Sequence, residues 1–190
     1  MLNILLLDNH DSFSYNLAAM FNNYKNVNVK VQIPENTNIE KISEFDKIIF
    51  SPGPGISTEV PFMDQIMKLY HKTHSILGVC LGYQAISLHF GGSISKLQEV
   101  NHGKQKKLNI IDSSSKIYQE VPQNSGIGLY HSWVLNKHDL PKCMKITGIC
   151  EDGNIMSVEH KEFPLFGLQF HPESFVTEYG SKIIDNWLKI

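Results

Sequence analysis

The strongest chemical signal in the sequence is a cysteine framed by two glycines. Gly78-Val79-Cys80-Leu81-Gly82 has the form G-x-C-x-G and lies between an expected strand and an expected helix. It is the thiol counterpart of the G-x-S-x-G elbow, in which a tight strand-to-helix turn projects a nucleophile at the start of the helix. The glycines leave room for the turn, the helix dipole favours a thiolate, and the backbone N–H of Leu81 is free to stabilise an oxyanion. Cys80 is therefore the candidate nucleophile, whereas Cys143 and Cys150 are expected to be structural.

A thiol nucleophile needs a base, and His171 is the best placed of the nine histidines. It follows an apolar stretch typical of a buried strand, so it should emerge at a sheet edge. Glu173 lies two residues further on, past a proline that fixes the turn. A carboxylate there can orient the imidazole and set its tautomer, which is the role of the third member of a triad. The residues thus suggest a Cys80–His171–Glu173 arrangement.

A second expected strand ends in the loop Ser51-Pro52-Gly53-Pro54-Gly55. Its glycines allow close approach of the backbone, and its prolines stiffen the loop and remove N–H donors. A phosphate-binding loop is excluded because G-x-x-x-x-G-K-[ST] is absent. Two interpretations stay open from these residues alone: a plain tight turn, or a second oxyanion donor beside the elbow.

Other candidates point to ordinary structural roles. His71 and His74 have an i,i+3 spacing, but no further ligands cluster nearby, so no metal site is expected. A basic stretch at Lys104, Lys106 and Lys107 is expected to be a solvated loop. Four aromatic residues near the N-terminus are expected in the core, namely Phe13, Tyr15, Phe21 and Tyr24.

The composition places the chain among ordinary globular proteins. It has 190 residues, a net charge of −2 and 42% hydrophobic residues, which suits one domain spanning residues 1–190 and excludes a disordered chain. A near-neutral net charge does not indicate non-specific nucleic-acid binding. No apolar run approaches the ~20 residues that a membrane-spanning helix needs. The first residues read as a strand and not as a signal peptide, and three cysteines favour a reducing compartment. A cytoplasmic protein is the expectation.

The elements that must position these residues alternate between strands and helices in the first half of the chain. Strands are expected at 3–7, 27–33, 47–51 and 75–79, and helices at 13–24, with Ser12 as N-cap, 61–71 and 83–90. The second half is richer in strands, at 107–112, 127–134, 144–150, 154–160 and 165–170, and ends in a helix at 179–188. This order predicts an α/β fold, a three-layer sandwich around a mixed, largely parallel sheet.

Taken together, the motifs resemble those of the class I, triad-type glutamine amidotransferases, and most closely the glutaminase subunits of anthranilate synthase and aminodeoxychorismate synthase. The resemblance covers essentially the whole chain and implies a flavodoxin-like fold. It rests on Leu6–Leu17, with its Asp-Asn-x-Asp-Ser-Phe stretch, and on Ser51–Gly55, Gly78–Ile86, His102–Lys104, Tyr130–Ser132 and Gln169–Ser174. The opening stretch is what points to the chorismate-linked branch.

The resemblance implies a role for each matched residue. Cys80 would attack the side-chain amide of glutamine, His171 would move the proton to ammonia, and Glu173 would orient His171. The remaining implied roles concern the substrate. Backbone N–H groups of Leu81 and of the Gly53-Pro54-Gly55 loop would stabilise the oxyanion, and Gln84 would bind glutamine. The backbone of Ser132 and Trp133 would hold the α-amino and α-carboxylate groups of glutamine. Position 133 is commonly leucine in these subunits, so the tryptophan is a departure; a backbone contact would survive it.

The resemblance also implies a partner, namely a large chorismate-binding synthase subunit, which receives the ammonia. No cofactor is expected in this chain, and magnesium is expected on the partner. The loops around Asn9–Tyr15 and His102–Lys107 are the expected docking region. Anthranilate synthase is the first expectation, with aminodeoxychorismate synthase, or a role shared by both, as the alternative. Two alternatives lie outside this class: the chain is an independent cysteine hydrolase of γ-glutamyl compounds, or it is a binding subunit without catalytic activity.

Overall fold

A computed structural model describes residues 1–190 and contains four α-helices and eleven strands. The helices are α1 (Ser14–Asn22), α2 (Pro61–Tyr70), α3 (Leu81–His89) and α4 (Gly180–Leu188). The strands are β1 (Leu2–Leu7), β2 (Val27–Gln32), β3 (Lys47–Phe50), β4 (Ser75–Val79), β5 (Ile94–Lys96), β6 (Lys104–Ile110), β7 (Ser125–Leu129), β8 (Trp133–Leu135), β9 (Met144–Cys150), β10 (Ile155–His160) and β11 (Leu165–Leu168).

Nine strands form one mixed sheet in the order β2-β1-β3-β4-β11-β10-β9-β6-β7. The first five of these are parallel to one another, and the remaining four pair antiparallel. Only β10 and β6 run against the common direction, so seven of the nine strands point the same way. Strands β5 and β8 form a separate antiparallel pair. The predicted mixed, largely parallel sheet is confirmed.

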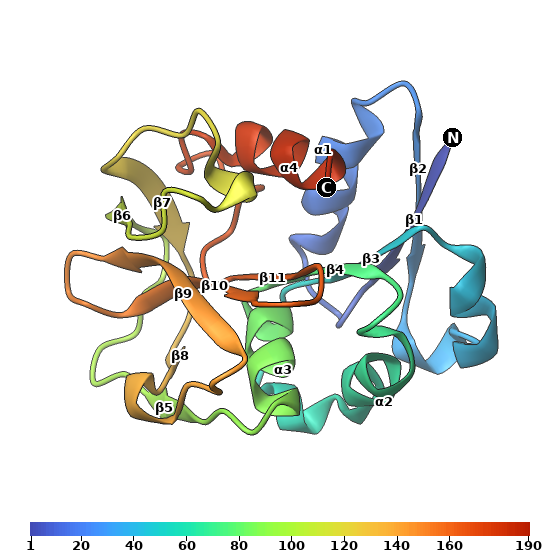
Figure 1. Ribbon diagram of the computed structural model, residues 1–190, viewed down its shortest axis with the longest axis horizontal. Helices are drawn as coiled ribbons and strands as arrows, with labels where there is room; N and C mark the ends of the chain where they lie inside the picture. The colour runs from blue at the N-terminus through green and yellow to red at the C-terminus, as the bar shows by residue number, and fades with distance from the viewer.

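Helices cover both faces of the sheet, which gives three layers (Figure 1). In that view α1 and α4 lie above the sheet, and α2 and α3 lie below it. The alternation of side chains along β1 supplies both interfaces. Ile4 and Leu6 belong to the core that includes Phe21 and Trp187, whereas Leu5 and Leu7 belong to the core that includes residues of α2 and α3.

The second half of the chain differs from the expected elements in two places. The expected strand at 127–134 is in fact two strands, β7 and β8, because the chain leaves the large sheet at Tyr130 and pairs next with β5. The expected loop around Lys104, Lys106 and Lys107 is part of β6, which pairs with β7. Strand β5, only three residues long, was not predicted.

The first helix also departs from expectation. It begins at Ser14 and has no side-chain N-cap bond from Ser12. Instead the Asp8 carboxylate accepts a hydrogen bond from the Ser14 hydroxyl at 2.6 Å, and the Asp11 carboxylate accepts one from the Phe13 N–H at 2.8 Å. The prediction that Tyr15 is a core residue is wrong, since its side chain is 68% exposed. The buried stripe of α1 consists of Ser14, Leu17, Ala18 and Phe21.

Candidate active site

Cys80 occupies a strained turn between β4 and α3. Its backbone lies at φ 51° and ψ −98°, a conformation that residues other than glycine rarely adopt. The turn is held because the Cys80 N–H donates to the Leu168 carbonyl at 2.7 Å. A Cβ at position 78 would lie 2.4 Å from the backbone of Gly82, and one at position 82 would lie 2.5 Å from Phe50. Both glycines of the motif are therefore required by close backbone packing.

His171 and Glu173 form a buried pair beyond the end of β11. His171 Nδ1 and Glu173 Oε1 are 2.7 Å apart, and the two side chains are 3% and 0% exposed. The His171 backbone is fixed because its N–H donates to Gly128 and its carbonyl accepts from the Thr177 hydroxyl. Burial by itself lowers the pKa of His171, but interactions with Cys80 and Glu173 outweigh burial and raise that pKa to about 10. The protonated imidazolium is thus the favoured form near Cys80.

A pocket of about 220 Å³ opens in front of Cys80. All seven residues expected to bind substrate line it, and they come from three separate segments of the chain: Gly53, Pro54 and Gly55; Leu81 and Gln84; Ser132 and Trp133. Two residues that were given no role, Tyr130 and His131, complete the lining. The structure therefore brings these seven residues together with Cys80, whereas His171 and Glu173 do not line the pocket itself.

The Gly53-Pro54-Gly55 loop is locked against the start of α3. A Cβ on Gly53 would lie 2.5 Å from Leu81 Cδ2 and 2.8 Å from Asn9 Cβ. Ser51 anchors the loop from below, since its hydroxyl accepts from the Asn9 N–H at 2.9 Å and donates to the Pro52 carbonyl at 2.6 Å. This packing favours the second of the two interpretations, because a plain turn needs no such contact with the nucleophile's helix.

Unpaired polar atoms gather around this pocket. Ten buried side-chain nitrogen or oxygen atoms in the chain lack a hydrogen-bond partner. Five of them belong to residues at or beside Cys80: Gln84 Oε1, His131 Nε2, Gln169 Oε1, His171 Nε2 and Glu173 Oε2. Because buried polar groups are nearly always paired in folded proteins, the unpaired atoms of Gln84 and His131, which line the pocket, indicate a site prepared for a polar ligand.

His131 and two aromatic rings are the site residues that sequence reasoning missed. His131 Nδ1 donates to the Trp133 carbonyl at 3.0 Å, and burial lowers the pKa of His131 to about 4, so this imidazole is neutral. The Phe13 and Tyr130 rings pack against the His171 ring, with centroids 5.3 and 5.0 Å away. Tyr130 and His131 lie in the Tyr130–Ser132 motif that supports the resemblance, but no spacing rule links them to His171. Phe13 was expected in the core.

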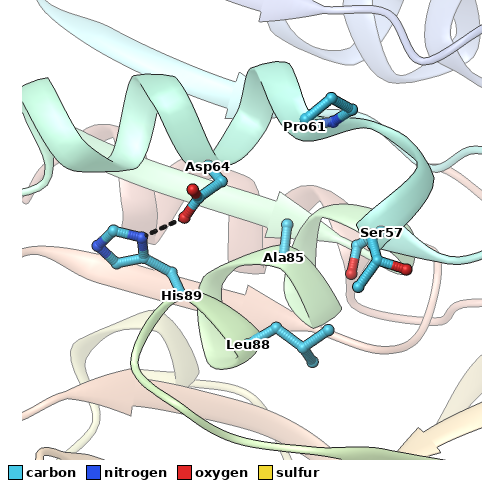
Figure 2. Close-up of a pocket in the computed structure, with 7 residues that line it drawn as sticks. Ser57, Pro61, Asp64, Ala85, Leu88 and His89 are labelled. Atoms are coloured by element: carbon cyan, nitrogen blue, oxygen red, sulfur yellow. Dashed lines mark hydrogen bonds and ion pairs between the residues drawn. The ribbon is translucent and has the colours of Figure 1, made fainter.

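A second pocket lies between α2 and α3, away from Cys80 (Figure 2). It contains another histidine–carboxylate pair, His89 Nδ1 and Asp64 Oδ1 at 2.7 Å. Figure 2 shows Ser57 across the pocket from His89. The pair therefore has no nucleophile beside it, and it also shares the Asp64 carboxylate with Lys68.

The structure has no group of three or more His, Cys, Asp or Glu side chains placed to hold a metal ion. The Nδ1–H group of His71, for example, donates to the Met67 carbonyl of α2 at 2.7 Å. None of the helices is both long and apolar enough to span a membrane.

Comparison with known proteins identifies the family of the chain. The family model for glutamine amidotransferase class-I matches residues 5–190. The chain is 38% identical to anthranilate synthase component 2 of Cyanophora paradoxa, over 97% of each chain. It is 34% identical to anthranilate synthase component 2 of Pseudomonas aeruginosa, over 98% of this chain and 94% of that one.

A solved structure supports the fold independently. A Thermoplasma acidophilum protein assigned to GMP synthase superposes with a TM-score of 0.88 at 23% identity, over 100% of this chain and 93% of the other. The chain belongs to the class I glutamine amidotransferases, because the family model and the relatives match nearly the whole sequence.

Proposed function

We propose that this amidotransferase is the glutaminase subunit of an anthranilate synthase and that Cys80, His171 and Glu173 are its catalytic triad. The observations that carry the triad are the strained elbow at Cys80, which lines the pocket, and the buried His171–Glu173 pair, whose imidazole interacts with Cys80. The names of the relatives, anthranilate synthase component 2, support the tryptophan-pathway assignment over aminodeoxychorismate synthase.

The reaction proceeds from the form in which the thiol proton of Cys80 lies on Nε2 of His171, whose pKa is raised to about 10. The thiolate attacks the δ-carbon of the glutamine side chain and forms a C–S bond, and the carbonyl oxygen becomes an oxyanion. Collapse breaks the C–N bond, and the proton on His171 goes to the departing ammonia. Water, deprotonated by His171, then cleaves the thioester to give glutamate and return Cys80 to its starting state.

The residues around Cys80 supply the complementary groups. Backbone N–H groups of Leu81 and of the Gly53-Pro54-Gly55 loop would face the oxyanion, because the loop packs directly on Leu81. Gln84 is 3% exposed and its unpaired Oε1 can accept a hydrogen bond from the substrate. Ser132 and Trp133 line the opposite side and would hold the α-amino and α-carboxylate groups through their backbone.

The ammonia released would pass to a chorismate-binding synthase subunit, which carries the magnesium; this chain uses no cofactor in the proposed reaction. Two exposed aromatic residues that lie close to site residues in the sequence support docking in this region. Phe175, two residues after Glu173, is 95% exposed, and Tyr15, two residues after Phe13, is 68% exposed. Aromatic side chains are enriched at protein–protein interfaces, and docking here would shield ammonia from solvent.

The proposal is tested by reconstitution. The purified chain is mixed separately with the anthranilate-forming and aminodeoxychorismate-forming large subunits of the same organism, and glutamine, chorismate and magnesium are added. Anthranilate is the expected aminated product. Aminodeoxychorismate alone would move the protein to folate synthesis, and glutamate release by the chain alone without amination would indicate an independent hydrolase.

Variants of the complex then test the nucleophile. Cys80→Ser should abolish glutamine-dependent synthesis and leave synthesis from added ammonium salt intact. Cys143→Ser, which removes a free cysteine outside the pocket, is the matched control and should retain both activities. Glutamine-dependent synthesis by Cys80→Ser would overturn the assignment of the nucleophile.

A further inference from the structure

A buried glutamine contacts the nucleophile directly and has no role in the mechanism above. Gln169 follows β11, whose last residue, Leu168, is in register with Val79 of β4. This register places Gln169 beside Cys80. Its Nε2 donates to Cys80 Sγ at 3.7 Å, and its side chain is completely buried.

The side-chain amide of Gln169 makes no hydrogen bond to the surrounding fold. The backbone at this position is held separately, because the Gln169 N–H donates to the Met156 carbonyl at 2.8 Å. The only hydrogen bond of the side-chain amide is the one to sulfur, and Oε1 has no partner. Burying an amide with so little compensation costs free energy, so an apolar side chain would serve the core better. The amide is therefore explained by what it does to the sulfur.

We propose that Gln169 is a further catalytic residue, whose Nε2–H group stabilises the thiolate of Cys80 and holds Sγ in position. This inference rests on the proposed function. The thiolate gains more from the N–H group than the thiol does, because hydrogen bonds to an ionised acceptor are the stronger ones. The helix dipole of α3 acts on the same sulfur, since Cys80 is the N-cap residue.

Gln169 acts at two points of the reaction. When the S–H bond breaks and the proton moves to His171, the N–H group stabilises the charge left on sulfur. When the C–S bond forms, sulfur loses that charge and the hydrogen bond weakens. When water cleaves the thioester, the C–S bond breaks, sulfur leaves as a thiolate, and the N–H group stabilises it again. Gln169 thus favours both formation of the nucleophile and departure of the leaving group.

The test measures the reactivity of Cys80 without glutamine. The rate of alkylation by iodoacetamide is followed against pH for the full chain, and peptide mass spectrometry separates Cys80 from Cys143 and Cys150. Gln169→Met removes the donor with an unbranched side chain of similar length, and Gln169→Glu replaces the amide with an isosteric carboxylate. The midpoint of the pH–rate profile should rise by about one pH unit in Gln169→Met and further in Gln169→Glu, because of like-charge repulsion.

Gln65→Met, at an exposed position on α2, is the matched control and should leave the midpoint unchanged. An unchanged midpoint in a folded Gln169→Met protein would overturn the inference; should that variant not fold, an unchanged midpoint in Gln169→Glu would do so. The proposed function is tested separately, since absence of glutamine-dependent amination by the wild-type complex would contradict it without altering the alkylation profile.

Discussion

The carboxylate of Glu173 lies 2.7 Å from Nδ1 of His171 in a region that excludes water from both side chains. A charged hydrogen bond in such surroundings stabilises the imidazolium more strongly than it would at the surface. It also fixes the tautomer, because Nδ1 carries the hydrogen of this bond. In the proposed reaction Nε2 is then the nitrogen that exchanges a proton with Cys80, and Glu173 sets both the orientation and the protonation of His171.

Glu173→Gln should shift the pH dependence of glutamine hydrolysis. The carboxylate is one of the groups that raise the pKa of His171 to about 10, so its replacement by a neutral amide lowers that pKa. In the pH profile of kcat/KM, the activity lost at alkaline pH reflects loss of the imidazolium proton. This alkaline limb should then move to lower pH by about one unit or more. The measurement is a pH profile of glutamate release by the complex.

The same variant should retain more activity than Cys80→Ser, because an orienting group contributes less than the nucleophile itself. Equal losses of glutamate release in the two variants, or an alkaline limb that does not move, would contradict the role assigned to Glu173.

Gly78→Ala should damage the elbow. The new Cβ would lie 2.4 Å from the backbone of Gly82, which cannot move without displacing the start of α3. Overpacking of this kind costs about 1–3 kcal/mol of unfolding free energy, and it should also slow alkylation of Cys80. Gly91→Ala is the comparison, since position 91 has a positive φ of 91° but no atoms within 4 Å of a new Cβ.

Gly91→Ala should therefore cost only the backbone strain, about 1–2 kcal/mol, and leave the reactivity of Cys80 at the wild-type rate. Denaturant unfolding and iodoacetamide alkylation measure the two effects. A Gly78→Ala protein with wild-type stability and alkylation would show that the elbow tolerates a side chain.

Trp133→Leu tests how the departure from the family pattern affects substrate binding. Trp133 lines the pocket, while its carbonyl is already engaged by His131 and its backbone begins β8. If glutamine is held by the backbone, the variant should keep KM for glutamine within about threefold, less than 1 kcal/mol of binding free energy. A tenfold change in KM without a change in kcat would show that the indole itself contacts the substrate.

Phe175→Asp should weaken association with the large synthase chain. Phe175 is 95% exposed and lies two residues after Glu173 in the sequence. Loss of an aromatic anchor at an interface typically costs about 2 kcal/mol, roughly thirtyfold in Kd. Leu69→Asp, on the end of α2 and 58% exposed, is the control and should leave Kd unchanged. Surface plasmon resonance with the immobilised synthase chain measures both, and equal Kd values for Phe175→Asp and wild type would place docking elsewhere.

The elements with strong local patterns were predicted well. Strands β1, β3 and β4 were expected to within one residue, because buried parallel strands are short continuous apolar runs. The bounds of β2, β9 and β10 were also expected to within one residue. The split between β7 and β8 was not predicted, since the apolar pattern continues through a bend that only pairing with β5 creates. Tyr15 was misplaced for a related reason: a helical stripe indicates which residues share a face, and the position of the sheet decides which of them is buried.

The sequence by itself predicted the chemistry, because a glycine-flanked cysteine is distinctive within a few consecutive residues and a His-Pro-Glu turn gains meaning once it is paired with that cysteine. Only the tertiary structure decided which groups meet. Parallel pairing of β4 with β11 brings Cys80, Gln169 and the His171–Glu173 pair together from positions about ninety residues apart. The contact of Gln169 with sulfur follows from that register. The contacts of Phe13 and Tyr130 with His171 bring in two further segments of the chain, which meet the histidine only in the folded structure.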